Sequence, residues 1–264
     1  MSPTAVRAAA VIAALAVLAI FLYFLAPTVN ACNVAYIPLH GDLKTYIPAT
    51  DLSTSTAQDE TASEDTTMAI RQAAADPSIE AIVLEIDSPG GDPVAGQEIE
   101  STLKSVTKPT VALIRSMGDS AAYMAATGAN TIFANQFSDV GDIGITESYT
   151  DQARQDVASG VTYNQLSIGK YKDMFATDKP LTPDEKALAI SQLQVYYQDF
   201  VNIVAQNRNM STSTVLALAD GASMPAQQAL QDGLIDKLGT IDDVRSFLAQ
   251  KLSNPAIICG IDTN

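Results

Sequence analysis

Residues 80–92 read Glu80-Ala-Ile-Val-Leu-Glu-Ile-Asp-Ser-Pro-Gly-Gly-Asp92, and this stretch decides the fold. The part up to Ile86 is a short apolar run rich in β-branched residues, which is typical of a buried strand in a parallel sheet. The paired glycines that follow let the backbone approach a ligand closely at the carboxyl edge of the strand. Their N–H groups can point at a developing negative charge, although the same residues also suit a tight turn into a helix.

The segments around this stretch alternate between expected strands and expected helices. Strands are expected at 33–43, 109–114 and 130–134, and helices at 68–75, 93–106 and 120–127. This alternation indicates a parallel sheet with crossover helices, and therefore an α/β fold. Residues 50–67 are polar and acidic and show no hydrophobic period, so we expect a mobile surface loop there.

The second half of the chain is expected to be mainly helical. Thr182-Pro-Asp-Glu185 is a capping box with proline at the first helical position, and it predicts a helix that runs to about Asn207. Shorter helices are expected near 213–219 and 225–232, and a final one over about 242–251. No internal repeat or linker is visible, so residues 31–264 are interpreted as a single domain.

Residues 1–30 are interpreted as an N-terminal transmembrane signal anchor. The apolar run from Ala8 to Pro27 is close to the length that crosses a hydrocarbon core. Arg7 precedes it, and no further basic residue follows until Lys44, which places the N-terminus in the cytoplasm and the domain outside the cell membrane. A cleaved signal peptide and a lipoprotein signal with lipidation at Cys32 are the alternatives.

The two cysteines, Cys32 and Cys259, lie near the two ends of the domain. Chain ends are often close in space, and disulfides form outside the cytoplasm. A Cys32–Cys259 disulfide and two unpaired thiols are therefore both open readings of the sequence.

The charge balance excludes some classes of function. The formal net charge is −15, which repels phosphate backbones and anionic lipid surfaces, so nucleic-acid binding is not expected. The only histidine, His40, lies at the end of an expected strand, where a structural role is the commoner one. A histidine-dependent catalytic triad would have to use His40.

Ser120 is the candidate nucleophile. It lies in Met117-Gly-Asp-Ser-Ala-Ala-Tyr123, directly after an expected buried strand and at the start of a helix. A serine at this point is close to unpaired N–H groups, which suits a reaction that develops an oxyanion. The alternative is that Ser120 only caps the helix.

A serine nucleophile needs a base, and Gly169-Lys-Tyr-Lys-Asp173 offers two lysines. A lysine can act as a base where burial lowers its pKa. Taken alone, the segment also fits an exposed loop with solvated lysines.

In their order and spacing these segments resemble the signal peptide peptidase A family of Ser–Lys serine peptidases. The resemblance rests on Ser-Pro-Gly-Gly after one strand, Ser-x-x-Tyr after the next, and Gly-x-x-Lys-Asp about fifty residues later. It implies that Ser120 is the nucleophile and Lys172 the base, since Lys172 and not Lys170 stands three residues after Gly169. It further implies that the backbone N–H groups of Gly91 and Ala121 form the oxyanion hole.

The same resemblance carries expectations about the whole molecule. The family's fold is the crotonase-like (Clp/crotonase) spiral of βαβ units. Its members need no metal or organic cofactor and act on peptides, here remnant signal peptides or other membrane-associated peptides. Short members form homo-oligomeric rings in which adjacent subunits supply the serine and the lysine.

Asp142 is the main departure from the family pattern. It stands in Val140-Gly-Asp-Ile-Gly144, where the family commonly carries a serine that contacts the catalytic lysine. An aspartate near Lys172 would favour the charged ammonium form, which opposes the role of a base. Two other functions therefore remain open: a catalytically impaired membrane scaffold of the same fold, and an acyl-CoA enzyme of the crotonase type.

Overall fold

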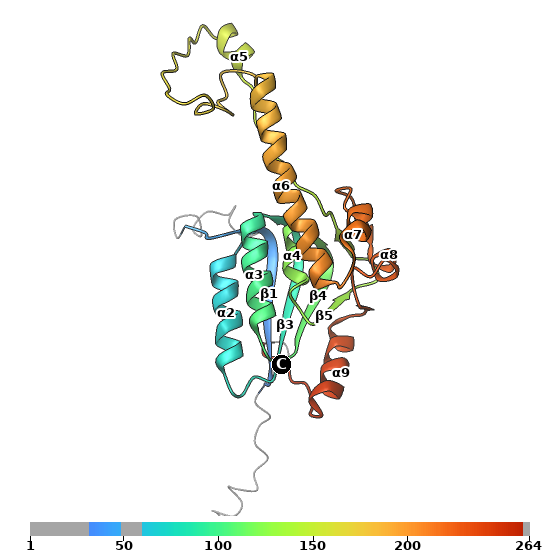
Figure 1. The fold of residues 1–264 in the computed structure, drawn as a ribbon. Coiled ribbons are helices and arrows are strands. Elements are labelled where there is room, and N and C mark those ends of the chain that lie inside the picture. Colours follow the sequence, from blue (N-terminus) through green and yellow to red (C-terminus); the bar gives the residue numbers. More distant parts are fainter. Residues whose placement is uncertain (1–31, 49–59, 261–264) are drawn as a thin grey trace, which may run out of the picture.

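The computed structural model describes residues 32–48 and 60–260 (Figure 1). Their centre is an eight-stranded sheet with the order β2-β1-β3-β4-β5-β8, in which β6 pairs with β4 and β7. All pairs are parallel except β6–β7. The strands are β1 (Val34–Lys44), β2 (Glu60–Ala62), β3 (Ala81–Gly91), β4 (Thr110–Asp119), β5 (Thr131–Ala134), β6 (Asp139–Gly141), β7 (Ser223–Pro225) and β8 (Lys237–Leu238).

Helices cover both faces of this sheet. Figure 1 shows α2, α3, α4 and the C-terminal half of α6 packed on one side, with α9 near the lower end of the molecule. The helices are α2 (Ser63–Ala75), α3 (Pro93–Ser105), α4 (Ala121–Ala126), α5 (Ala153–Ala158), α6 (Pro183–Asn207), α7 (Thr212–Leu218), α8 (Ala226–Gln231) and α9 (Ile241–Leu252). The strands and helices expected from the sequence are therefore confirmed, with small shifts at their ends.

The alternation of side chains along each strand builds two hydrophobic cores. On β3, Ile82, Leu84 and Ile86 face the larger core under α2, α3 and α4. Ala81 and Val83, which alternate with them, face the smaller core with Val244 and Leu248 of α9. Successive side chains of a strand point to opposite faces, so an apolar run without alternation is what a strand covered on both sides requires.

The expectation of a loop over residues 50–67 is wrong for its last part. Residues 60–62 form β2, which pairs in parallel with residues 42–44 of β1, and α2 begins at Ser63. Ser63, Thr66 and Thr67 are buried although they are polar. Pairing with β1 and packing against α3 outweigh the polar composition, which had indicated a loop. The remaining residues of that expectation, up to 59, lie outside the described residues.

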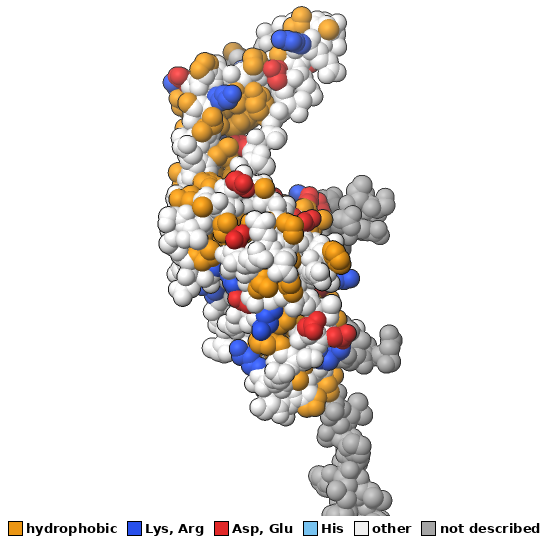
Figure 2. Space-filling model, turned by 90° about the vertical axis from the view of Figure 1, so that its right-hand side faces the viewer, with side chains coloured by type: hydrophobic (Ala, Val, Ile, Leu, Met, Phe, Trp, Pro, Cys, Tyr) orange, Lys and Arg blue, Asp and Glu red, His pale blue; other side chains and the backbone are white. Residues whose placement is uncertain are grey.

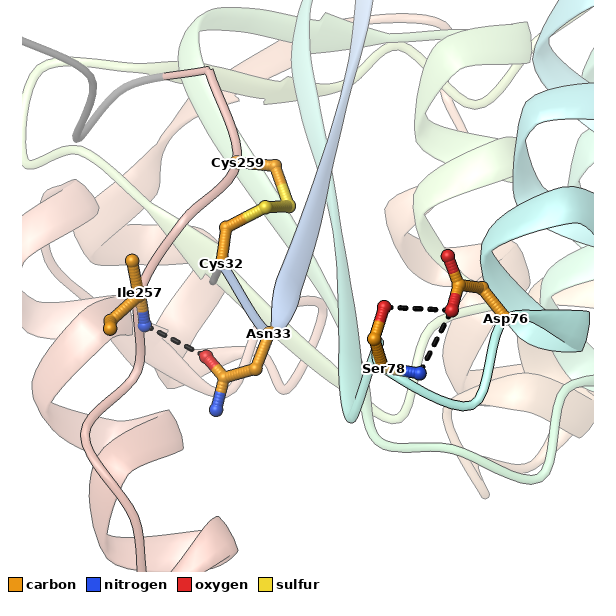
Figure 3. Close-up of a disulfide and its surroundings, with 6 residues drawn as sticks. All are labelled: Cys32, Asn33, Asp76, Ser78, Ile257 and Cys259. Carbon is orange, nitrogen blue, oxygen red and sulfur yellow. Dashed lines mark hydrogen bonds between the residues drawn. A yellow bond between two sulfur atoms is a disulfide. The ribbon is translucent and has the colours of Figure 1, made fainter. Parts of the chain in front are cut away.

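The two ends of the domain are tied together (Figure 3). Cys32 and Cys259 form a disulfide with their Cα atoms 5.0 Å apart. Beside it, the side-chain oxygen of Asn33 accepts a hydrogen bond of 2.9 Å from the N–H of Ile257, and Val34 forms a parallel bridge with Ile258. The sequence left open whether Cys32 and Cys259 form a disulfide or remain unpaired thiols, and in the structure they form the disulfide.

The expected anchor at residues 1–30 lies outside the described residues. Within 32–48 and 60–260, no helix is long and apolar enough to cross a membrane.

Residues 146–196 form a projecting segment, which we call the arm. The rest of the described chain is the body. Figure 1 shows α5 and its flanking loops at the far end of α6, well away from the sheet. The buried apolar residues of α6 gather near its C-terminal end, at Phe200, Val201 and Val204, so the helix is anchored there and its other end extends from the body. The capping box at Thr182 and Glu185 is present as expected.

Candidate active site

Ser120 lies at a sharp turn between β4 and α4. Its backbone has φ 53° and ψ −125°, a conformation that a residue with a side chain rarely adopts and that costs about 1–3 kcal/mol. The turn is held by the Ser120 N–H, which donates to the carbonyl oxygen of Gly141 at 2.8 Å. The side chain is partly exposed and makes no capping hydrogen bond, so the reading of Ser120 as a plain helix cap is not supported.

The end of β3 packs directly against this turn. A Cβ atom placed on Gly90 would lie 2.8 Å from the Cβ of Ser120 and 3.0 Å from the N atom of Ala121, so only glycine allows this approach. Gly90 and Gly91 have φ angles of +105° and +139°, which side chains disfavour. The expected oxyanion-hole residues Gly91 and Ala121 therefore flank the turn that holds Ser120. The sequence indicated Gly91, but Gly90 is the residue that lies against Ser120.

The residues that follow Ser120 are core residues. The side chains of Ala121 and Ala122 are buried in the larger hydrophobic core. Tyr123 is fully buried, and its hydroxyl donates to the carbonyl oxygen of Leu234 at 2.8 Å. The short helix α4 therefore fixes the turn from behind while Ser120 stays accessible. A pocket of about 590 Å³ opens nearby at the ends of β1, β3 and β4; it is lined by His40, Gly41, Asp42, Glu60, Asp87, Pro89, Arg115 and Met117, and Ser120 is not part of its lining.

Two carboxyl groups lie beside the turn. Asp142 follows β6, has φ 47°, and its N–H donates to the carbonyl oxygen of Ala222. Burial raises the pKa of Asp142 above its ordinary value. Asp119, the residue before the nucleophile, is only 9% exposed, and its Oδ1 atom has no hydrogen-bond partner among the described residues. Burial and then the charges of Asp142 and Asp139 raise the pKa of Asp119 to about 6.

Our reading of the sequence missed Asp119. The available signal was an acidic residue that ends a buried strand and directly precedes the candidate nucleophile.

Lys172 lies in the arm, away from this turn. It is exposed, and its N–H donates to the carbonyl oxygen of Gly169 at 3.1 Å. Within the described part of one chain, no contact joins Lys172 to Ser120. The structure therefore brings Gly91, Ala121 and Asp142 close to Ser120, but it leaves Lys172 on a different part of the molecule (Figure 1).

Two lysines near Lys172 in sequence, Lys170 and Lys179, already form ion pairs. Lys170 pairs with Asp184 at 2.8 Å and lies over the ring of Tyr171, and the hydrogen bond to Asp184 raises the pKa of Lys170 above its ordinary value. Lys179 pairs with Asp173 and Glu185. For Lys172 no ion-pair partner is present in residues 32–48 and 60–260. Lys172 is thus not held by a carboxylate, and the same is true of Lys186 near the start of α6.

His40 belongs to a separate polar network. Its Nε2 atom lies 2.7 Å from Oε2 of Glu85, whose other carboxylate oxygen accepts a hydrogen bond of 2.7 Å from Arg115. Burial alone would raise the pKa of Glu85, but the hydrogen bonds from Arg115 and His40 outweigh it and lower the pKa. These contacts agree with the structural role expected for His40.

Comparisons with known proteins now give the family. The family model described as peptidase family S49 matches residues 102–254, a range that includes both Ser120 and Lys172. Over 178 residues the chain is 31% identical to "Serine protease SPPA, chloroplastic" of Arabidopsis thaliana, covering 66% of this chain and 26% of that protein. Over 184 residues it is 31% identical to "Protease 4" of Salmonella typhi, covering 69% and 30%.

Other relatives are nearer to this chain in length. The chain spans 62% of the matching proteins from Methanocaldococcus jannaschii and Synechocystis, and 55% of the one from Enterococcus faecium.

A solved structure shows the fold. A mutant of ClpP1 from Listeria monocytogenes superposes with a TM-score of 0.51 at 12% sequence identity, covering 79% of this chain and 92% of that one. The expected Clp/crotonase-like fold is thereby confirmed. Because the family model matches more than half of the sequence, the chain belongs to peptidase family S49 and resembles its SppA members.

Proposed function

We propose that this chain is a serine endopeptidase in which Ser120 is the nucleophile and Lys172 of a neighbouring copy is the general base. The observation that carries the proposal is the strained turn at Ser120, held against Gly90 by a close backbone approach. Strain of this kind persists where the surrounding structure imposes it, and it gathers at catalytic positions. Membership of a peptidase family supports the assignment.

The proposed reaction is an acyl transfer in two steps. The Ser120 hydroxyl oxygen attacks a peptide carbonyl carbon while Lys172 accepts its proton, and the N–H groups of Gly91 and Ala121 stabilise the resulting oxyanion. Lys172 returns the proton to the leaving amine, and the C–N bond breaks. Water then hydrolyses the acyl-enzyme by the same route. This chemistry requires no metal or organic cofactor.

The separation of Ser120 and Lys172 supports a site shared between copies. Lys172 is exposed and unpaired in the arm, and exposed apolar side chains precede it closely in the sequence, including Leu166 at 98% exposed and Ile168 at 100%. Figure 2 shows hydrophobic side chains gathered on the upper part of the molecule, which the arm forms. Apolar patches of this kind commonly mark contacts between proteins. We therefore propose a homo-oligomeric ring in which each arm reaches the body of its neighbour.

The substrates that we propose are remnant signal peptides or other membrane-associated peptides. This rests on the likeness to SppA proteins and on residues 1–30, which we propose to anchor the chain in the cell membrane with the domain outside.

A catalytically impaired scaffold is the second candidate. Asp119 and Asp142 favour it, because carboxylates beside the nucleophile would hold an approaching lysine in its charged form.

Labelling with a fluorophosphonate probe and hydrolysis of a fluorogenic peptide test the proposal. Wild type should be labelled at Ser120 and should hydrolyse the peptide. Ser120→Ala and Lys172→Ala should each lower the rate by about 1000-fold or more, as loss of a nucleophile or its base does. Lys170→Ala is the matched control and should keep the wild-type rate, because Lys170 is paired with Asp184.

Mixed oligomers test the sharing of sites. Ser120→Ala and Lys172→Ala subunits, each inactive alone, should regain activity when they are mixed, since some sites then combine an intact serine with an intact lysine. Undiminished hydrolysis in either single variant would exclude the dyad, and an unlabelled, inactive wild type would favour the scaffold.

A further inference from the structure

We propose that Asp119 and Asp142 form a carboxyl pair that receives the side-chain ammonium of Lys172 from a second copy of the chain, and that this contact sets the pH at which the peptidase becomes active. The inference rests on the proposed function and adds Asp119 to the site as a positioning residue. Its basis is the geometry of the two strand ends that carry these carboxyl groups.

The pairing of β4 with β6 brings the two groups together. Asp119 pairs in register with Gly141, the residue before Asp142, and the next N–H along the chain, that of Ser120, donates to the carbonyl oxygen of Gly141. The same hydrogen-bonded corner therefore fixes Asp119, Ser120 and Asp142. A group that reaches the nucleophile from outside the chain also comes close to both carboxyl groups.

Asp119 is a buried acid that lacks a full set of partners. It is 91% buried, and its Oδ1 atom has no hydrogen-bond partner within the ranges that the structure describes. Buried polar atoms are nearly always hydrogen-bonded, and a buried carboxylate without a partner is costly. Asp119 therefore places beside the Ser120 turn a negative charge that no cation within the described part of one chain compensates.

The groups that act on Asp119 are acidic or neutral. From β6 and the turn after it come Asp139 and Asp142, both of which raise the pKa of Asp119, and from β7 comes Ser223, whose hydroxyl offsets part of that rise. No cation is among these influences. The corner beside Ser120 is thus negative, and it is complementary to a positively charged group.

Lys172 is the cation that best matches this corner. In the arm Lys170 and Lys179 are each held by carboxylates, whereas Lys172 and Lys186 are both exposed and unpaired, and the proposed function assigns Lys172 to the site. An ammonium group has three N–H donors and no acceptor, so it can donate to the partly exposed carboxylate of Asp142 while the negative charge of Asp119, just behind it, attracts it. A metal ion fits less well, since among the described residues no three His, Cys, Asp or Glu side chains are grouped to hold one.

The contact has a defined effect on activity. Negative charges beside an ammonium favour its charged form, so the lysine loses its proton, and becomes a base, only at higher pH. Each carboxyl group therefore moves the acidic limb of the pH–rate profile toward higher pH. Asn has nearly the same shape without the charge, so replacing either aspartate with Asn should move that limb to lower pH.

The experiment measures pH–rate profiles of the full-length wild type, Asp119→Asn, Asp142→Asn and the control Asp139→Asn with a fluorogenic peptide that carries no charge. Asp119→Asn and Asp142→Asn should each move the acidic limb down by about one pH unit. Asp139→Asn should move it less, because the exposed Asp139 side chain is screened by solvent. The rate of Ser120 labelling by a fluorophosphonate should show the same limb without any peptide.

An unchanged limb in both variants would overturn the inference. A second peptide, with lysine before the scissile bond, separates substrate binding from positioning. If the variants raise KM for that peptide alone and leave the limb in place, the pair binds substrate, and the inference is again overturned. Asp142 is partly exposed, so Asp142→Asn keeps the test valid if Asp119→Asn fails to fold.

The proposed function fails by a different result. It fails if Lys172→Ala keeps full activity, whatever the pH profiles show. If Lys172 is essential and the limb does not move in either variant, the inference alone fails.

Discussion

The body and the arm use the same kinds of side chain for different purposes. Ile82 in the body is 0% exposed and lies in the larger core, whereas Ile168 in the arm is 100% exposed. In the body, apolar side chains stabilise the fold of one chain. In the arm they can gain little until another surface covers them, because the free energy of apolar burial depends on the area removed from water.

The candidate site is divided between the same two regions. Ser120 lies in the body, in a backbone conformation fixed by Gly90 and Gly141. Lys172 lies in the arm, where its environment depends on what the arm contacts. We therefore propose that folding of one chain builds the nucleophile and that assembly adds the base.

The largest expected difference between the two regions is in the cost of truncating an isoleucine. Ile82→Ala should lower the free energy of unfolding by about 4 kcal/mol, because it leaves a cavity in the core. Ile168→Ala should change it by no more than about 0.5 kcal/mol. Chemical denaturation measures both values.

Size-exclusion chromatography of the same two variants measures how each substitution changes the oligomeric state. Ile168→Ala should weaken the oligomer. Ile82→Ala should leave the oligomer unchanged when the comparison is made under conditions in which both variants are equally folded. An Ile168→Ala variant that unfolds as easily as Ile82→Ala would show that the arm folds against its own body.

The body was largely predictable from the sequence, and the reasons are local. The apolar run at 80–86 has β-branched residues and is followed by a turn that contains Gly90 and Gly91, so β3 was clear before any tertiary contact was known. The prediction was wrong where pairing with another strand determines the secondary structure. Glu60–Ala62 is a strand only because it pairs with β1. The three-residue strand β6 was not expected either, and without it Asp119 and Asp142 could not be placed together.

For the arm, the sequence predicted local structure but not the position of the segment relative to the body. Its capping box predicted the start of α6 correctly, because Thr182 and Glu185 satisfy each other's backbone N–H groups within one turn. That signal says nothing about where the helix points. Lys172 was chosen by resemblance to a family pattern, and we propose that a second chain brings its side chain to Ser120, which no local pattern records.

The second prediction concerns the disulfide that closes the body. Reduction, or the double replacement of Cys32 and Cys259 by serine, should lower the free energy of unfolding by about 3 kcal/mol, since the bond links residues 227 apart in sequence and restricts the unfolded chain. Denaturant midpoints with and without a thiol reductant measure the effect.

The arm should not respond to the loss of the disulfide. Limited proteolysis within the exposed residues 159–170 should proceed at the same rate in oxidised and reduced protein, because the bond lies at the other end of the molecule (Figure 1). Equal midpoints in the two states would mean that the Asn33–Ile257 and Val34–Ile258 contacts hold the chain ends without help.

The third prediction compares one glycine in each region. Gly90→Ala should cost about 2 kcal/mol more than Gly160→Ala, because its Cβ would lie 2.8 Å from the Cβ of Ser120 and 2.9 Å from the carbonyl oxygen of Asp119, whereas no atom lies within 4 Å at Gly160. Both residues have positive φ angles, +105° and +73°, so each variant carries backbone strain, and Gly90→Ala adds the steric contact and the larger departure from the left-handed region. The turn at Ser120 must move to relieve that contact, so Gly90→Ala should also lose fluorophosphonate labelling while Gly160→Ala keeps it. Full labelling of Gly90→Ala would mean that the conformation of Ser120 does not depend on the approach of β3, and the nucleophile would then owe its geometry to β4 and β6 alone.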